Sequence, residues 1–131
     1  MPLQWSLEVV TVCVSDVDRA KQFYAEQVGF HLDLDLWVSD DQRVVQFTPS
    51  GSGCSIQLKL GETRIDGLQL VVSDVDAARA ELAERGVDAS RVMHFENGIR
   101  VRGRGEAWNS FVFFSDPDGN AWVVQERPAG I

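Results

Sequence analysis

The sequence predicts an α+β fold built from two copies of a βαβββ module. The peptide Val-Ser-Asp-Val-Asp occurs at Val14–Asp18 and again at Val72–Asp76, each time between an apolar strand pattern and a helical pattern. Further strand patterns follow each helix. We expect modules at residues 6–60 and 66–127 that share one domain, residues 1–131. In that domain the modules pair into a curved, mixed, eight-stranded sheet with the two helices outside.

Each copy of the repeat is typical of a strand that runs directly into a helix. Apolar residues alternate along the first strand of each copy, at Val10, Val12 and Val14 and at Leu68, Leu70 and Val72. The side chains that can cap the free N–H groups of each helix are Ser15 or Asp16 and Ser73 or Asp74. Gly29 and Gly86 stand where a left-handed residue ends a helix.

Strand patterns complete each module. In the first module they cover His31–Val38, Arg43–Thr48 and Cys54–Leu60. Along His31–Val38, strict alternation would place Asp33, Asp35 and Trp37 on one side. In the second module they cover Ala89–Glu96, a ragged strand within Asn97–Ala107, and a hairpin of Asn109–Ser115 with Ala121–Glu126. Pro and Gly in the segment Asp116–Asn120 predict a tight turn.

The composition is that of an ordinary soluble globular protein, with 44% apolar and 24% charged residues. The net charge of −8 argues against nucleic-acid binding, which needs Lys and Arg to neutralise phosphates. No apolar run approaches the roughly 20 residues that span a bilayer, so we expect no membrane partner. The N-terminus lacks signal-peptide features, and Cys13 and Cys54 form no disulfide framework. We therefore expect a cytoplasmic location with both thiols reduced.

Together these motifs resemble the vicinal oxygen chelate superfamily, which includes glyoxalases, bleomycin-resistance proteins and extradiol dioxygenases. The duplicated module, Val-Ser-Asp before each helix, and Asp-Pro-Asp-Gly-Asn at Asp116–Asn120 carry the resemblance. It extends from about Ser6 to Arg127. The resemblance implies the glyoxalase/bleomycin-resistance fold and, because exposed strand edges of such sheets commonly pair, a homodimer.

Enzymes of this superfamily hold a metal through His, Glu or Gln on the first and last strands of each module. The resemblance places these four positions at Val9, Gln57, Gly67 and Val123. One neutral amide cannot supply the three imidazole, carboxylate or thiolate donors that a divalent transition metal needs. A one-residue shift of register would offer Glu8 with Gln125 or Glu126, but it would turn the apolar side chains into the cavity. His31 and His94 fall outside these positions. We therefore expect no metal and no cofactor.

The same alternation predicts the lining of the concave side of the sheet. The polar side chains expected to face away from the helices are Thr11, Cys13, Ser55, Gln57, Lys59, Gln69 and Gln125. A few polar groups among apolar ones in a concave sheet suit a small-molecule site, although a purely structural sheet exposed to water would show the same pattern. Trp37 and Trp108 are expected to add aromatic walls.

The loop Asn97–Trp108 carries Arg100, Arg102 and Arg104. These guanidinium groups can clamp a carboxylate or phosphate, or they can lie in water along an edge strand. The sequence leaves both interpretations open. The same loop is the best candidate for a mobile lid.

The leading hypothesis is a metal-independent protein that binds a small organic molecule in the cup of the sheet and has no catalytic residue. The predicted ligand contacts are Thr11, Cys13, Trp37, Gln57, Lys59, Gln69, Trp108 and Gln125. The alternative is an enzyme: a glyoxalase-like lyase, isomerase or dioxygenase with a divergent metal site. The sequence leaves open which of the two is correct.

Overall fold

The structure is a computed structural model that describes residues 2–130. The chain has the predicted α+β architecture and divides into two compact units between Arg64 and Ile65. This boundary falls between the two predicted modules. Each unit contains one sheet and one of the two helices that the repeat predicts.

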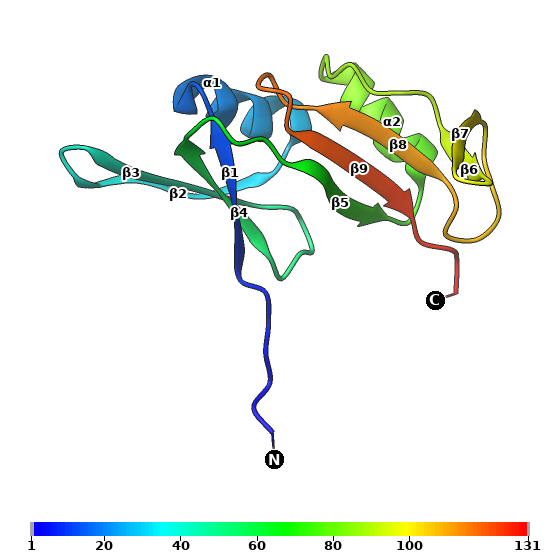
Figure 1. Cartoon of the computed structure of the whole chain (residues 1–131), viewed down its shortest axis with the longest axis horizontal. Coiled ribbons are helices and arrows are strands. Elements are labelled where there is room, and N and C mark those ends of the chain that lie inside the picture. The colour runs from blue at the N-terminus through cyan, green and yellow to red at the C-terminus, as the bar shows by residue number, and fades with distance from the viewer. Residues whose placement is uncertain (1, 131) are drawn as a thin grey trace. The chain divides into compact units, whose positions relative to one another are not determined.

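The first unit contains a mixed sheet of four strands. These are β1 (Val9–Val14), β2 (His31–Ser39), β3 (Gln42–Thr48) and β4 (Ser55–Leu60), arranged in the order β1-β4-β3-β2. β1 runs parallel to β4, whereas β2, β3 and β4 pair antiparallel. In Figure 1 the β2–β3 hairpin extends beyond the rest of this sheet.

The helix of the first unit begins and ends where the sequence predicts. The Asp16 side chain accepts a hydrogen bond from Arg19 N at 3.0 Å, and α1 (Val17–Gln22) follows. The helix continues with π-type turns as η1 (Phe23–Val28) and ends at Gly29, whose φ of 86° is left-handed. Tyr24 is fully buried and its ring contacts Phe47 of β3.

The second unit contains a mixed sheet of five strands. These are β5 (Asp66–Val72), β6 (Met93–Glu96), β7 (Ile99–Arg102), β8 (Phe111–Ser115) and β9 (Ala121–Glu126), arranged in the order β5-β9-β8-β6-β7. β7 is the ragged strand expected within residues 97–107. α2 (Val75–Glu84) is capped by Asp74, which accepts from Ala77 N, and is followed by left-handed Gly86. It packs along one face of β8 and β9 (Figure 1).

Side chains alternate between two faces of each sheet, as the sequence predicts. Val12 and Leu58 of the first unit, and Trp122 and Val124 of the second, are buried on the face toward the helix. The neighbouring residues are more exposed. Leu60 departs from the pattern: it lies at the end of β4 and is 71% exposed. We call the side of each sheet that points away from its own helix the open face.

The turn between β8 and β9 is fixed by two buried side chains. Asp116 Oδ1 accepts hydrogen bonds from Asp118 N and Asn120 N, and Asp116 Oδ2 accepts from Asn120 Nδ2 at 2.8 Å. Asn120 is fully buried, and its Oδ1 accepts from Ile65 N just before β5. These carboxylate and amide groups therefore hold the turn, as the sequence interpretation of this motif predicts.

Candidate functional site

The open face of the four-stranded sheet carries a hydrogen-bond network that ends on Asp33. Thr48 Oγ1 donates to Asp33 Oδ2 at 2.5 Å, and Gln46 Nε2 donates to the same oxygen at 3.0 Å. Gln57 Nε2 in turn donates to Gln46 Oε1 at 2.8 Å. Ser55 Oγ lies 2.6 Å from Thr48 Oγ1 and is the donor, because the single Thr48 proton points to Asp33. The hydrogen bonds from Thr48 and Gln46 lower the pKa of Asp33.

This network fixes the orientation of the Gln57 amide. A carboxylate only accepts hydrogen bonds, so Gln46 must present its NH2 group to Asp33 and its oxygen to Gln57. Gln57 then donates a hydrogen bond from its own NH2 group to Gln46. Its carbonyl oxygen has no protein donor among residues 2–130 and is available as an acceptor at the open face.

Three other predicted residues of the first unit lie beside Gln57 on β1 and β4. Thr11 is directly opposite Gln57 in the parallel β1–β4 pair, and Cys13 is opposite Lys59. Cys13 is half-buried, and a Cβ atom added at Gly61 would come within 2.9 Å of its Sγ. β1 and β4 therefore bring these four predicted residues together.

Trp37 lies on the other side of this sheet, because β2 does not alternate strictly. The β2–β3 register shifts between Leu32 and Leu34. Asp33 therefore reaches the open-face residues of β3, whereas Asp35 and Trp37 point toward the helix side. There Trp37 has the Arg43 guanidinium 5.6 Å from its ring centre, and with Lys59 it lines a cavity of about 590 Å³.

On the helix side of the sheet, Asp35 links α1 to the β2–β3 hairpin. Its carboxylate accepts from Lys21 Nζ at 2.6 Å and from two Arg43 nitrogens at 2.8 and 2.9 Å. The hydrogen bonds from Arg43, and to a lesser extent the one from Lys21, hold the pKa of Asp35 well below its usual range. Asp35 in turn raises the pKa of Arg43. A carboxylate so strongly held in its ionised form is a poor general base. The pair therefore has a structural role.

The open face of the five-stranded sheet brings three predicted residues into contact. Gln69 Nε2 donates to Gln125 Oε1 at 2.7 Å, and Gln125 Nε2 donates to the backbone oxygen of Trp108 at 2.7 Å. The Gln69 carbonyl oxygen is thereby left as an acceptor with no donor among the described residues. Trp108 has a φ of 65°, which is uncommon for a residue other than glycine, and its side chain is 43% exposed.

Three phenylalanines that the sequence interpretation missed stand on the same open face. Phe111 is opposite Gln125 and Phe113 is opposite Val123 in the β8–β9 pair. Phe95 of β6 packs edge-on against both rings, with centroid separations of 5.3 and 6.3 Å. The alternation in Phe-Val-Phe-Phe, extended across the hairpin from Gln125, was the sequence signal that could have found them.

Arg100 of β7 covers this aromatic cluster. Its guanidinium carbon lies 3.6 Å from the centre of the Phe113 ring. Stacking of this kind holds the group in place without using its N–H donors. No hydrogen-bond acceptor for Arg100 occurs among residues 2–130.

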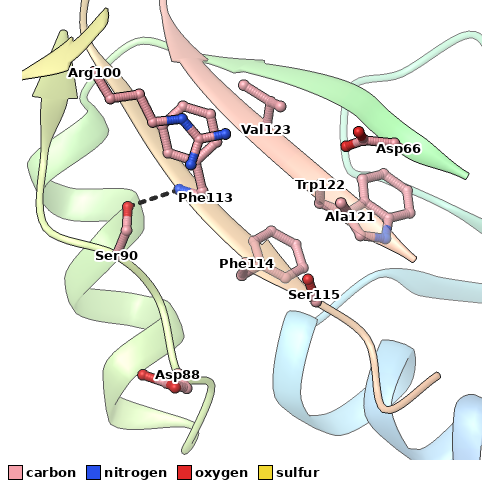
Figure 2. Close-up of a pocket in the computed structure, with 10 residues that line it drawn as sticks. All are labelled: Asp66, Asp88, Ser90, Arg100, Phe113, Phe114, Ser115, Ala121, Trp122 and Val123. Carbon is pink, nitrogen blue, oxygen red and sulfur yellow. Dashed lines mark hydrogen bonds between the residues drawn. The ribbon is translucent and has the colours of Figure 1, made fainter. Parts of the chain in front are cut away.

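A cavity of about 450 Å³ lies beside Arg100 and Phe113 in the second unit. Figure 2 shows Arg100 and Asp66 projecting from opposite sides of Phe113 and Val123. Asp66 reaches the open face because the β5–β9 register shifts at Gly67, which has a φ of 92°. Among the described residues Asp66 has no hydrogen-bond or ion-pair partner.

The loop between β7 and β8 is tied to α2 by Arg104. Arg104 forms an ion pair with Asp76 at 2.7 Å and a second with Glu126, which also accepts from Val75 N at the helix start. Glu126 raises the pKa of Arg104, and Arg104 lowers that of Glu126. His94 Nδ1 contacts Gly103 O and Nε2 contacts Glu96, and both contacts raise the pKa of His94. All three arginines are exposed but differ in their contacts: Arg104 is paired, Arg100 is stacked on Phe113, and Arg102 has neither kind of contact within residues 2–130.

The four positions that hold a metal in related enzymes do not fit one here. Val9 and Val123 offer no side-chain donor atom, and Gln57 offers only one neutral carbonyl oxygen, too few ligands for a divalent transition metal. Gly67 lies at a register shift with left-handed backbone, a conformation that a ligating residue adopts only with strain. Across residues 2–130 no group of three or more His, Cys, Asp or Glu side chains is arranged to hold a metal ion.

Comparison with known proteins identifies the family. Residues 6–124 match the profile of the Glyoxalase/Bleomycin resistance protein/Dioxygenase superfamily. The chain is similar to the crystal structure of TnmS3, an antibiotic binding protein from Streptomyces sp. CB03234, with 30% identity and a TM-score of 0.76 over 97% of this chain and 99% of that chain. A glyoxalase/bleomycin resistance protein from the same organism is 32% identical, with a TM-score of 0.73 over 92% of this chain and 100% of that chain.

A curated relative is more distant. The uncharacterized protein YetH of Bacillus subtilis (strain 168) is 24% identical over 123 residues, which cover 89% of this chain and 94% of YetH. None of the helices within residues 2–130 has the length and apolar character needed to cross a membrane. From its profile match and its structural neighbours, the chain belongs to the Glyoxalase/Bleomycin resistance protein/Dioxygenase superfamily.

Proposed function

We propose that the protein binds a small organic molecule at the open faces of its sheets and does so without a metal ion. The observation that carries this proposal is the open face of the second sheet. There a cavity of about 450 Å³ adjoins the stacked guanidinium of Arg100, whose N–H donors meet no acceptor in the described part of the chain. Apolar walls with a few oriented polar groups are typical of small-molecule sites.

Further support comes from the predicted contacts that the structure brings together within each unit. In the second unit Gln69, Gln125 and Trp108 form one hydrogen-bonded group. In the first unit Gln57 presents an oriented carbonyl oxygen beside Thr11, Cys13 and Lys59. The similarity to TnmS3, an antibiotic binding protein, is consistent with a small-molecule ligand. Trp37 lies on the helix side, and we do not include it.

Metal analysis tests the proposal against the enzyme alternative. The full chain is purified without chelator, and its content of Zn, Ni, Mn and Fe is measured by mass spectrometry beside the Gln57→Ala variant. We expect only trace metal in both proteins and no rise of melting temperature with added Zn²⁺ or Ni²⁺. One metal equivalent per chain that is lost in Gln57→Ala would overturn the proposal of metal-independent binding and favour the enzyme alternative.

A thermal-shift screen tests ligand binding itself. We expect some members of a diverse library of small organic molecules to raise the melting temperature, because a ligand that binds only the folded state stabilises it. A library without any stabilising compound would overturn the proposal. Light scattering of the same preparation tests the homodimer, which we propose together with a cytoplasmic location.

A further inference from the structure

We propose that the open face of the second sheet selects an aromatic carboxylate and that Arg100 is the residue that binds its acid group. This inference rests on the proposed small-molecule function and names the ligand class. Three features of the second unit support it: the stacked guanidinium of Arg100, the apolar surface beside it, and the carboxylates elsewhere in the cavity lining.

Arg100 is held in position while its donors stay unused. The guanidinium lies 3.6 Å from the Phe113 ring centre, and no acceptor within residues 2–130 bonds to it. By contrast, Arg104 and Arg43 each bond to carboxylates. A planar guanidinium with free N–H edges matches the two oxygens of a carboxylate. Because the side chain is already ordered, binding such a group costs little further conformational entropy.

One part of the surface beside Arg100 is apolar and partly aromatic. Phe113, Val123 and Ala121 line the cavity, and Phe95 and Phe111 pack against Phe113 at the same face. A flat ring buries a large apolar area against such a surface and loses little internal freedom. This arrangement favours an aromatic ring next to the acid group.

Two carboxylates limit where an acid group can lie in the cavity. Asp66 lies across Phe113 and Val123 from Arg100, and Asp88 lies beyond Ser90 (Figure 2). Like-charge repulsion disfavours an acid group beside either carboxylate, so the ligand carboxylate is expected at Arg100 and the ring toward β9. Removing the Asp66 charge should therefore leave the affinity for the aromatic carboxylate unchanged or raise it slightly.

Isothermal titration calorimetry of the full chain with three naphthalene probes tests this inference. The probes are 2-naphthoate, neutral 2-methylnaphthalene and cationic 2-naphthylmethylammonium, which share one ring system. We expect 2-naphthoate to bind most tightly. Arg100→Gln should weaken its binding by about tenfold or more, the usual loss for a charge-assisted hydrogen bond. The neutral probe should lose less than about twofold, because it forms no such bond.

Arg102→Gln is the matched control. Arg102 is on β7, two residues along from Arg100 and therefore on the same face, but it does not line the cavity. The Arg102→Gln substitution removes the same charge as Arg100→Gln and should change 2-naphthoate binding by less than about twofold. Equal losses in both variants would show a diffuse charge effect and overturn the inference, provided that the melting temperatures of both variants match the wild type.

The inference and the proposed function can fail separately. Preference for the cationic or neutral probe, or no binding of any naphthalene probe, would overturn the choice of an aromatic carboxylate. The small-molecule function would still stand if other compounds in the thermal-shift library stabilise the protein. It would fall only if that library also contains no ligand.

Discussion

Equivalent cross-strand pairs of the two sheets differ in chemistry at one face and agree at the other. At the open face, Gln46 and Gln57 face each other in the first unit with a 2.8 Å hydrogen bond, whereas Phe113 faces Val123 in the second. At the helix side both units place large apolar pairs, Phe47 with Ile56 and Phe114 with Trp122, and all four are buried.

The duplicated scaffold thus fixes where side chains point, while residue type decides what each open face can bind. In the first unit the donors converge on Asp33, so most of the polar capacity is satisfied within the protein. In the second unit the aromatic rings are packed, but no acceptor among the described residues takes the Arg100 donors. The second face is therefore the one that we propose binds the ligand.

The largest expected effect is on stability and distinguishes the two faces of strand β8. Phe114→Ala should cost about 3–5 kcal/mol of unfolding free energy, because it leaves a cavity in the core beside Trp122. Phe113→Ala should cost only about 1–2 kcal/mol, because its ring is half-exposed. Urea denaturation measures both. Equal losses would mean that Phe113 is part of the core and not of a binding surface.

The next effect compares the turns of the two units. Asn120→Ala should cost about 1–3 kcal/mol, because it removes the buried hydrogen bonds that the Asn120 side chain forms with Ile65 N and Asp116 Oδ2. Ser52→Ala removes hydrogen bonds to Cys54 in the exposed turn of the first unit and should cost less than about 0.5 kcal/mol. Denaturation midpoints compare them, and a larger loss in Ser52→Ala would contradict the structure.

These turns also show why much of the fold was predictable from the sequence. Asp16 and Asp74 as helix caps, Gly29 and Gly86 as helix ends, and Asp116–Asn120 as a turn depend on local conformation alone. Local preferences of this kind are carried by a few adjacent residues.

The site was only partly predictable, because register shifts are not visible in an alternating pattern. The shift at Leu32–Leu34 sends Trp37 to the helix side, and the shift at Gly67 brings Asp66 to the open face. Gln69, Gln125 and Trp108 were predicted, but the carbonyl contact of Trp108 depends on its backbone conformation. Arg100 could not be separated from Arg102 and Arg104 without the contacts of each.

A smaller effect tests the Asp33 network. Asp33→Asn should cost roughly 1 kcal/mol at neutral pH, because a neutral amide oxygen accepts weaker hydrogen bonds from Thr48 and Gln46 than a carboxylate oxygen does. The Asp33 pKa is lowered in the folded state from its ordinary value of 3.8. Its contribution is therefore present above that value and is lost as the pH falls through the folded pKa. Unfolding free energies at several pH values should show this acid loss in the wild type and less of it in Asp33→Asn.

The smallest effect concerns His94 beside the loop of the second unit. Its folded pKa is raised, so the stability that it contributes is fully present below its ordinary value of 6.5 and is lost as the pH rises through the folded pKa. His94→Gln should remove this dependence. Melting temperatures of the two proteins from pH 5 to pH 9 measure it, and parallel curves would show that His94 does not titrate with folding.

The central claim is that the second sheet, rather than the first, carries the ligand. Amide chemical shifts of the ¹⁵N-labelled full chain, titrated with the strongest stabilising compound from the thermal-shift screen, test it most directly. The account predicts the largest shift changes in β8 and β9, over residues 111–115 and 121–126, with Arg100 among them. Largest changes in β3 and β4, over residues 42–48 and 55–60, would contradict it.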